Sequence, residues 1–308
     1  MPVSEQTATA TRPGGRRRLR LTSRSVAPYL FVLPNMLIFG LFTIWPAINM
    51  FNISLYNSSN GRQFTWVGGA NYSEILSSAE FGAVFLRTVI FTALYVTLTT
   101  LLATFGAVLL NDSFRGRGFF RAVIFLPSLL SAVVVGLIWG WMLERTNGVV
   151  NNILVALGGT RVAWLTQDTL TFGVVVFVGL WIHVGFYTLI MLSGLQGIEP
   201  ALYEAARVDG ATGWQQFRHI TWPLLRPTTL VVLILSTISG FQSFDFIYTL
   251  TGGGPVGATT LMVQYVYEKA FLSPVRYGIA SAGSVVLFVC VFAFTLVNYL
   301  NGRRQEAA

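Results

Sequence analysis

The sequence predicts an all-α membrane protein with six transmembrane helices, and two observations carry this prediction. Hydrophobic residues make up 54% of the 308 residues and charged residues only 10%, whereas a typical soluble domain carries about 25% charged residues. Six apolar runs are long enough to cross a hydrocarbon core of about 30 Å, which takes about 20 helical residues. The six runs are 28–51, 84–110, 119–143, 171–195, 227–250 and 277–300.

The first run follows a basic tail. It exceeds the apolar region of a signal peptide, about 7 to 15 residues, so we expect an uncleaved helix. Six arginines precede or open it, at positions 12, 16, 17, 18, 20 and 24. Such a block either binds nucleic acid or flanks a membrane helix on the cytoplasmic side, where it contacts anionic lipid. No aromatic residues separate the arginines for stacking on bases, so we expect membrane lipid and no nucleic acid as a partner.

Lysine and arginine residues are unevenly divided between the two sides of the predicted membrane. With the N-terminus inside, the inner side holds 14 of them and the outer side six. The outer six are Arg62, Arg87, Arg145, Arg161, Lys269 and Arg276. Because positive charge is retained on the cytoplasmic side, both termini are expected in the cytoplasm. We expect one transmembrane domain, 28–300, between an N-terminal tail, 1–27, and a C-terminal tail, 301–308.

The later runs carry few interruptions. Gly136 and Gly140, in the third run, have the spacing that lets two helices approach closely. The chain has no pair of interrupted runs in corresponding positions, the pattern typical of a secondary transporter. Only one cysteine, Cys290, is present, so neither an internal disulfide nor a multi-cysteine metal site is expected.

The loop between the fourth and fifth runs, 196–226, is organised rather than flexible. Pro200 suits a first helical turn. The helix expected over 201–209 ends at Gly210, which takes a left-handed conformation more readily than any other residue. These signals predict a helix followed by a glycine elbow.

A second short helix is expected after the elbow. Thr212 and Gln215 have the spacing of a capping box that opens it, and Pro223 is expected to end it. Three of its apolar residues share one face because they are spaced by three: Trp214, Phe217 and Ile220. A flexible connector needs none of these signals. The loop either packs against its own bundle or, as we favour, docks on a cytoplasmic partner.

The same loop carries a recognisable motif. It reads Glu204-Ala205-Ala206, three residues, Gly210, nine residues, Ile220, one residue, then Trp222-Pro223. This pattern resembles the "EAA" motif of permease subunits from binding-protein-dependent ABC importers. The usual ending is Ile-x-Leu-Pro, so Trp222 is a departure that bears on the exact docking contacts.

Other segments extend the resemblance. "FDFIYTLTGGGP" (244–255), "ATTLMVQYVYEKAF" (258–271) and "WVGGANYSEIL" (66–76) are similar to segments of carbohydrate-uptake permeases of the maltose-importer type. The resemblance covers about residues 28–300. It implies an ABC importer permease fold, with cytoplasmic coupling helices that lie in a groove of an ATPase.

The resemblance also implies roles and partners. Glu204 would be the acidic contact to the ATPase and Gly210 the elbow. The spacing of Trp214 and Phe217, and not the motif, makes them candidates either to fill the groove or to pack against the bundle. The expected coupling residues are Glu204, Ala205, Ala206, Asp209, Gly210, Trp214, Phe217, Ile220 and Pro223. The implied partners are a second, related permease subunit, two ATP-binding cassette subunits and an extracytoplasmic solute-binding protein. The implied location is the cytoplasmic membrane of a bacterium or archaeon.

The chain holds no energy source of its own. A P-loop needs Gly-x-x-x-x-Gly-Lys-Ser/Thr, yet the only lysine, Lys269, follows Glu268. No acid pair, Ser/His/Asp set or metal cluster is visible, so we expect no enzyme activity, no bound cofactor and no metal. ATP and magnesium are expected on the partner ATPase subunits.

A translocation pathway needs polar groups at membrane depth that face the bundle, because lipid exposure of an ionisable group costs a few kcal/mol. Hydroxyl, amide and aromatic groups suit a neutral sugar. The candidates are Ser128, Ser131, His183, Ser239, Gln242, Ser243 and Asp245. For each serine the alternative is a bond to a backbone carbonyl of its own helix. For Asp245 it is a packing or gating role.

The sequence therefore predicts the permease subunit of an ABC importer for a sugar or oligosaccharide delivered by a binding protein. One alternative is a glycerol-phosphate-type solute, but an anionic substrate favours Arg at membrane depth, and none lies there. Another is a self-sufficient proton-coupled transporter that uses Asp245 and His183 as its relay. Such a transporter would not need the organised loop 196–226.

Overall fold

The computed structural model describes residues 23–306 and divides the chain into two units, residues 1–49 and 50–308. The arginines at 12, 16, 17, 18 and 20 lie outside the described residues, so the structure does not describe the predicted basic tail.

The first unit contains α1 (Ser23–Phe39) and a π-helical turn, η1 (Gly40–Ile44). Helix α2 (Trp45–Ile53) begins in the first unit and ends in the second. The turn precedes Pro46, which has no N–H to bond the carbonyl four residues back. The N–H of Trp45 bonds the carbonyl of Gly40, five residues back, and this wider turn accommodates the proline. The helical stretch Pro28–Ile53 is long and apolar enough to cross a membrane, as the first run predicts.

The second unit opens with a small hairpin. Strand β1 (Tyr56–Asn57) pairs antiparallel with β2 (Thr65–Trp66), with Tyr56 opposite Trp66, and α3 (Ala70–Ser77) follows. The side-chain amide of the buried Asn71 donates to the carbonyls of Ser54 and Tyr56 at 2.8 and 2.9 Å and so holds the hairpin to α3. An all-α prediction misses this pair because two-residue strands leave no periodic pattern in the sequence.

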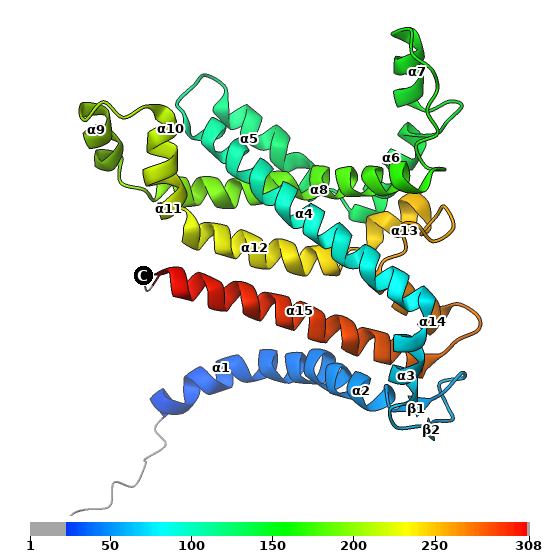
Figure 1. Ribbon diagram of the computed structural model, residues 1–308. Helices are drawn as coiled ribbons and strands as arrows, with labels where there is room; N and C mark the ends of the chain where they lie inside the picture. Colours follow the sequence, from blue (N-terminus) through cyan, green and yellow to red (C-terminus); the bar gives the residue numbers. More distant parts are fainter. Residues whose placement is uncertain (1–22, 307–308) are drawn as a thin grey trace, which may run out of the picture. The chain divides into compact units, whose positions relative to one another are not determined.

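Four long helices run along one another in the second unit (Figure 1): α4 (Ala79–Asn111), α8 (Asp168–Gln196), α12 (Arg226–Phe241) and α15 (Tyr277–Glu306). Small residues let α4 approach α8. Ala103 and Ala107 are fully buried, and a Cβ on Gly106 would lie 3.1 Å from the side chain of Thr188. Close packing of small residues is the usual basis of helix association in membranes, where lipid tails are as apolar as the helix surface.

The third predicted run, 119–143, is not one continuous helix, and this corrects the prediction. It consists of α5 (Arg117–Phe125), a 3-10 turn η2 (Leu126–Leu129) and α6 (Ala132–Met142). The two helical parts meet at 98°. Pro127 removes a backbone donor in the turn, and Leu130 and Ser131 are extended, with ψ of 148° and 129°.

The fifth predicted run, 227–250, is also interrupted. Helix α12 ends at Phe241, and Phe244 has φ −148° and ψ −56° before a short helix, α13 (Asp245–Thr251), begins. The third and fifth predicted runs are therefore each interrupted, whereas the sequence analysis expected each to be a single span. The high average hydropathy of each run conceals both breaks, although polar residues lie at them, because hydropathy reports burial in lipid and not the continuity of the backbone hydrogen bonds.

The two short helices that follow these breaks pack against each other. A Cβ on Gly136 of α6 would lie 2.6 Å from the carbonyl oxygen of Phe246 in α13, so only glycine fits. The hydroxyl of Thr249 donates to the carbonyl of Val133 at 3.1 Å. The predicted close approach at Gly136 is confirmed, and its partner is α13.

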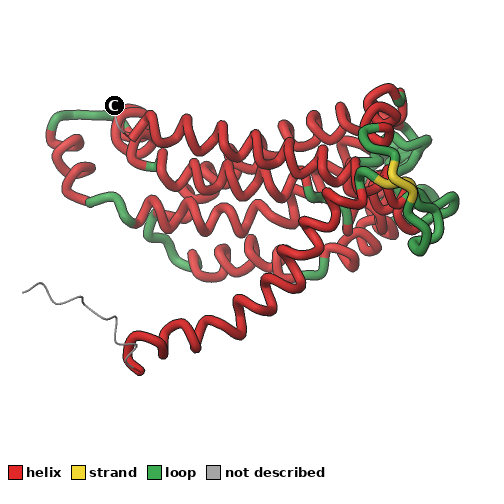
Figure 2. The backbone as a smooth tube through the Cα atoms, turned by 90° about the horizontal axis from the view of Figure 1, so that it is seen from below, coloured by secondary structure: helices red, strands yellow, loops and turns green. Residues whose placement is uncertain are grey.

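Loops and short elements gather at the end of the second unit that carries the hairpin, opposite the C-terminus (Figure 2). They include α7 (Val149–Ala156) and α14 (Met262–Phe271). We call this the hairpin end, and the opposite end the C-terminal end.

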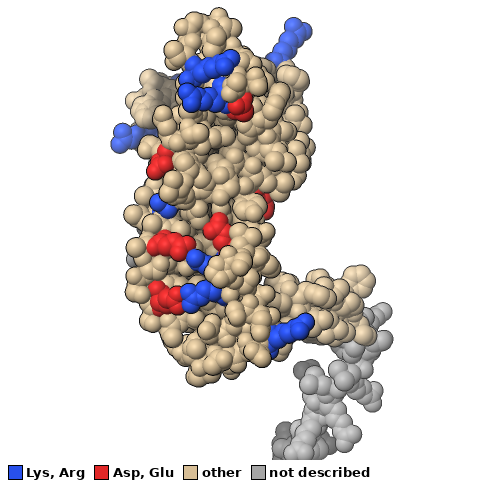
Figure 3. All heavy atoms as spheres, turned by 90° about the vertical axis from the view of Figure 1, so that its right-hand side faces the viewer, with Lys and Arg blue, Asp and Glu red and all other residues tan. Residues whose placement is uncertain are grey.

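Acidic and basic side chains lie next to each other at the hairpin end (Figure 3). Lys269 Nζ lies 3.1 Å from Glu80 Oε1, and Arg276 binds both carboxylate oxygens of Glu74. Within the described residues these are the ion pairs that the structure contains. The guanidinium of Arg276 lowers the pKa of Glu74, through its hydrogen bonds first.

By length and composition, four described helices are suited to cross a membrane, or up to six if each of two bent helix pairs is one span. The four are Pro28–Ile53, Ala79–Asn111, Asp168–Gln196 and Tyr277–Leu300. The bent pairs contain α5 with α6, and the helical segment before α12 with α12 itself. The last helix continues through the predicted C-terminal tail to Glu306.

Candidate functional site

The organised loop predicted over 196–226 lies at the C-terminal end of the second unit (Figure 1). It begins with α9 (Pro200–Val208), which has Pro200 in its first turn. The motif residues Glu204 and Ala205 are exposed on this helix, and Asp209 is exposed just after it. Ala206 is half-buried. The acidic part of the motif therefore faces away from the protein's own helices.

The glycine elbow is confirmed. Gly210 has φ +79°, and a Cβ at this position would meet no atom within 4 Å. Its conformation alone therefore requires glycine. The N–H of Ala211 donates to the carbonyl of Ala206 at 2.9 Å and closes the helix end.

The second helix opens with the predicted capping box. Thr212 accepts from the N–H of Gln215, and the side chain of Gln215 accepts from the N–H of Thr212. Helix α10 (Gly213–Gln216) follows, and it continues as a π-helical turn, η3 (Phe217–Thr221), and as α11 (Trp222–Leu224). The backbone N–H groups at the start of a helix have no partner within the helix. In a capping box two side chains accept hydrogen bonds from two of these N–H groups, and this fixes the residue at which the helix begins.

Pro223 does not end the second helix, and the prediction was wrong on this point. The N–H of Trp222 bonds the carbonyl of Phe217, five residues back. This wide turn accommodates the proline, as at Pro46, and the helix runs on to Leu224. A bend of 65° then separates the helix from α12.

The predicted apolar face of the second helix is divided between two surroundings. The ring of Trp214 stacks on that of Phe217, with centroids 5.6 Å apart, and Trp214 is 68% exposed. Phe217 is half-buried, and Ile220 packs against the hydrophobic core. Trp214 is thus available to a partner, whereas Ile220 anchors the segment to its own bundle.

One residue of this site was missed in the sequence. The hydroxyl of Tyr203 in α9 lies 2.9 Å from the hydroxyl of Thr221 in the π turn. Thr221 is buried, with 5% of its surface exposed. The bond joins the two arms of the elbow. Tyr203 directly precedes Glu204, but nothing in its sequence position points to a partner eighteen residues away.

The serines predicted at membrane depth are mostly bonded within the protein. Ser128 donates to the carbonyl of Phe125 at 2.7 Å, and Ser243 donates to the carbonyl of Ser239 at 2.8 Å. The hydroxyl of Ser239 lies 3.1 Å from that of Tyr187, a buried tyrosine that the sequence analysis missed. For Ser128 and Ser243 the structure therefore has the alternative arrangement, a bond to the backbone.

The remaining candidates lie at or beside the helix breaks, except His183. Gln242 and Asp245 are exposed on the two sides of the break between α12 and α13, and Ser131 is exposed where α6 begins. His183, in the middle of α8, is half-buried, and its Nδ1 lies 3.1 Å from the carbonyl oxygen of Gly179. No hydrogen bond among the described residues joins His183 to Asp245, as a proton relay would need.

Within the described part of the chain, no group of three or more His, Cys, Asp or Glu residues is placed to hold a metal ion. The functional features are therefore an exposed, rigid helix pair at one end and exposed polar groups at two helix breaks. Together with the apolar helices they are the features expected of a membrane transport subunit.

Comparisons with known proteins agree with this class. The model of the family "Binding-protein-dependent transport system inner membrane component" matches residues 99–306. The trehalose/maltose transport system permease protein MalF of Thermococcus litoralis is 39% identical over 276 residues, which cover 89% of this chain and 93% of that protein. The sn-glycerol-3-phosphate transport system permease protein UgpA of Agrobacterium fabrum is 32% identical and covers 89% and 94% of the two chains.

A solved structure is also similar. It is a bacterial ABC transporter involved in the import of the acidic polysaccharide alginate, with a TM-score of 0.81 and 27% identity over 92% of this chain and 96% of that one. The chain belongs to the binding-protein-dependent transport system inner membrane component family. It is a permease subunit of an ABC importer, a membrane transport component rather than an enzyme. This membership sets aside the self-sufficient proton-coupled transporter.

Proposed function

We propose that this permease translocates a sugar or oligosaccharide that an extracytoplasmic binding protein delivers, in the cytoplasmic membrane of a bacterium or archaeon. The observation that carries the proposal is the elbow of α9 and α10, in which the motif residues Glu204, Ala205 and Gly210 are exposed rather than packed in the chain's own core. The similarity to a trehalose/maltose permease over nine-tenths of the chain supports the sugar.

The proposed topology has six spans, with both termini and the elbow in the cytoplasm. The excess of Lys and Arg on that side supports the orientation. So does the position of the end of α15, which lies at the same end of the second unit as α9 and α10 (Figure 1). The hairpin end, with its loops and paired charges, then faces the binding protein.

In this proposal the elbow transmits force. Glu204 and Asp209 make the acidic contacts to a cytoplasmic ATPase, and Trp214 fills part of the groove that receives the segment. Gly210 sets the angle between the two helices, and Ile220 ties them to the bundle. The proposed coupling set is completed by Ala205, Ala206, Phe217 and Pro223. A rigid elbow passes displacement to α12 more directly than a flexible loop would.

The partner chains complete the transporter. We propose a second permease subunit, which would be a different but related chain, and two ATP-binding cassette subunits. ATP and magnesium bind to those ATPase subunits, since this chain offers no P-loop. Closure of the ATPases around ATP draws the elbow inward and switches the pathway from inward-facing to outward-facing.

The substrate pathway is proposed to pass the two helix breaks. Gln242, Asp245 and Ser131 are exposed there, and their amide, carboxylate and hydroxyl groups match the hydroxyl groups of a sugar. Ser239, His183, Ser128 and Ser243 are proposed to lie along the same route. Backbone that is interrupted at membrane depth is tolerated where it lines a cavity.

The elbow is tested in proteoliposomes that contain the full complex with its binding protein. A Glu204→Arg substitution should leave assembly intact but uncouple ATP hydrolysis from uptake, because like charge replaces the acidic contact. The matched control is Asp168→Arg, an exposed acidic residue at the start of α8, at the opposite end of that helix from the elbow. Unchanged uptake per ATP in Glu204→Arg would contradict the docking role.

A second candidate substrate is a glycerol-phosphate-type solute, which the 32% identity to UgpA favours. The two are separated by uptake of radiolabelled substrate in the presence of unlabelled maltose-type oligosaccharides, acidic oligosaccharides or glycerol 3-phosphate. If only neutral oligosaccharides compete with uptake, the result supports a sugar as the substrate. If only glycerol 3-phosphate competes, the result contradicts the proposal that the substrate is a sugar.

A further inference from the structure

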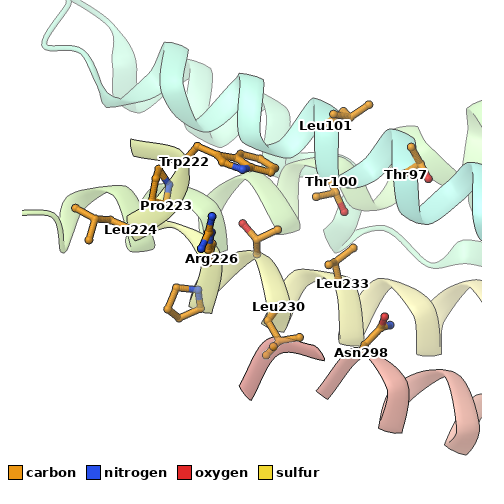
Figure 4. Close-up of a pocket in the computed structure, with 13 residues that line it drawn as sticks. Thr97, Thr100, Leu101, Trp222, Pro223, Leu224, Arg226, Leu230, Leu233 and Asn298 are labelled. Atoms are coloured by element: carbon orange, nitrogen blue, oxygen red, sulfur yellow. The ribbon is translucent and has the colours of Figure 1, made fainter. Parts of the chain in front are cut away.

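Trp222, where the chain departs from the usual motif, lies beside a groove at the C-terminal end of the second unit. The groove has a volume of about 750 Å³ and runs between α4, α11, α12 and the end of α15. Figure 4 shows Trp222 and Arg226 at one side of it, with Thr100 of α4 facing Leu233 of α12. Trp222 also lines a second cavity, of about 790 Å³, with Phe105, Phe217 and Arg218.

The walls of the groove continue into surfaces suited to lipid. Leu98 and Leu101 of α4 are 37% and 57% exposed, and Val231 of α12 is 47% exposed. Apolar side chains that remain exposed on membrane-spanning helices contact acyl chains or a partner helix. The groove is therefore a hollow in an apolar surface, and its polar residues need a separate explanation.

Thr100 is the first of these polar residues. It is 8% exposed and lines the groove, yet its hydroxyl has no hydrogen-bond partner. Threonines in a helix usually donate to a carbonyl of the preceding turn, and Thr88 and Thr104 of the same helix do so at 2.8 and 2.7 Å. The hydroxyls of Thr92 and Thr99 also lack a partner, but neither residue lines the groove. Figure 4 shows the Thr100 hydroxyl directed from α4 toward α12. A buried hydroxyl in this position calls for an acceptor supplied by a ligand.

Arg226 is the second polar residue. It is the first residue of α12 and lines the groove beside Pro223 and Trp222. Among the described residues it has no ion pair, whereas both ion pairs of the described chain lie at the hairpin end. Arg218, in the neighbouring cavity, likewise has no ion pair there. An unpaired guanidinium beside an apolar hollow complements an anion that carries apolar chains.

The depth of Thr100 in the membrane follows from the length of α4. Helix α4 has 33 residues and is about 50 Å long, so it exceeds a core of about 30 Å by about 10 Å at each end. Thr100 lies eleven residues before Asn111, about 16 Å from that end and so about 6 Å inside the core. The ester carbonyls of a phospholipid lie at the edge of this core, so the lipid must settle about 6 Å into the hollow for a carbonyl to reach Thr100, with its phosphate toward Arg226.

We propose that the groove binds an anionic glycerophospholipid. Its phosphate pairs with Arg226, an ester carbonyl accepts the hydroxyl hydrogen of Thr100, and an acyl chain lies along Leu101, Leu230 and Leu233. Trp222 covers the glycerol region with its indole. The assignment to the inner leaflet rests on the proposed orientation, but the lipid site itself does not. The lipid fastens α4, α12 and α15 together at the base of the elbow.

The test uses the purified complex with its partner subunits, reconstituted in nanodiscs that hold equal amounts of phosphatidylglycerol and phosphatidylcholine. The complex is extracted into detergent, and the retained lipids are measured by native mass spectrometry. The wild type should retain phosphatidylglycerol in preference. Arg226→Gln should lower this preference about tenfold, because a charge-assisted hydrogen bond is lost. Thr100→Val should lower retention of both lipids about threefold, because a neutral hydrogen bond is lost.

The control is Arg115→Gln, which removes an exposed arginine from the same end without touching the groove. It should leave the preference unchanged, which separates a site from general surface attraction. Equal retention of the two lipids by the wild type, or an equal loss in Arg115→Gln and Arg226→Gln, would overturn the proposal.

A second measurement reports contact between the lipid and Trp222 directly. Brominated phosphatidylglycerol should quench a part of the tryptophan emission that is missing from Trp222→Phe. If wild type and Trp222→Phe are quenched alike, no lipid reaches the groove and a protein segment fills it, which overturns the proposal. Uptake is not the readout, so failure here leaves the proposed sugar transport untouched.

Discussion

The hydroxyl of Tyr203 lies 2.9 Å from the hydroxyl of Thr221, and this bond joins the first helix of the elbow to the π turn of the second. Thr221 is buried and Tyr203 half-buried, so the bond is sheltered from water. It is the one side-chain hydrogen bond that joins α9 to the second arm among the described residues. The angle of the elbow therefore depends on two features. Gly210 supplies the left-handed backbone conformation of the bend, and the Tyr203–Thr221 bond holds the two arms together.

Removing the Tyr203 hydroxyl should loosen the elbow without dismantling it. A neutral buried hydrogen bond contributes about 1 kcal/mol, or about a fivefold change in the population of one arrangement. In Tyr203→Phe we expect less uptake per ATP hydrolysed, with assembly unchanged. Tyr72→Phe is the matched control, since it removes a hydroxyl 2.6 Å from Ser54 at the hairpin end. If Tyr203→Phe and Tyr72→Phe took up the same amount of substrate per ATP hydrolysed, the Tyr203–Thr221 bond would have no role in coupling ATP hydrolysis to transport.

Gly210→Ala should strain the elbow through its backbone alone. The φ of +79° disfavours any residue with a Cβ by about 1 to 2 kcal/mol, while no neighbouring atom obstructs the methyl group. Asparagine tolerates this conformation better than alanine, so Gly210→Asn should retain more uptake than Gly210→Ala. The uptake and ATPase rates of both variants, measured side by side, check the order. The reverse order would show that space rather than conformation matters there.

The contact between α6 and α13 should be sensitive to one methyl group. In Gly136→Ala the new Cβ would overlap the side chain of Thr249 and the backbone of Phe246, and overpacking of this kind costs about 1 to 3 kcal/mol. In Gly140→Ala the nearest atom is 3.9 Å away, so no loss is expected. Thermal unfolding of the purified complexes compares them. If both variants unfolded at a similar temperature, α6 and α13 would be able to move apart and accommodate the methyl group without loss of stability.

The Glu74–Arg276 pair predicts a pH dependence of stability at the hairpin end. Arg276 lowers the pKa of Glu74 in the folded protein, so the pair stabilises the fold above the ordinary pKa of the carboxyl, about 4.3. This contribution is lost as the pH falls through the lowered pKa. Both side chains are about half exposed, so it should be below about 1 kcal/mol.

The measurement for this pair is the melting temperature of the wild type and of Glu74→Gln between pH 3 and pH 7. The difference should be small and present near pH 7, and it should shrink at the acidic end. A difference that grows toward low pH would contradict the sign of the shift.

Much of the fold follows from local signals in the sequence. The long helices α4 and α8 contain their predicted runs and extend them by a few residues, because 20 apolar residues in a row have few other stable arrangements in lipid. The left-handed Gly210 and the capping box at Thr212 were also predicted, because each depends on residues only a few positions apart.

The breaks were not predictable in the same way. Pro127 and Pro223 carry the same local signal, a missing donor. The structure turns the chain sharply after the first and continues the helix through a π turn at the second. Which outcome occurs depends on the neighbours each segment packs against. The break before Asp245 has no proline at all; α13 lies against Gly136, more than a hundred residues earlier in the chain.

The sequence by itself determined that the chain belongs in a membrane, where the long apolar helices lie and where the elbow bends, because composition, period and capping are local properties. The tertiary structure decided which faces of that elbow remain free, where the helices break, and that Tyr203 meets Thr221 and Thr100 shares a groove with Arg226. Those relationships depend on contacts between residues far apart in the chain, and such contacts form only when the helices pack.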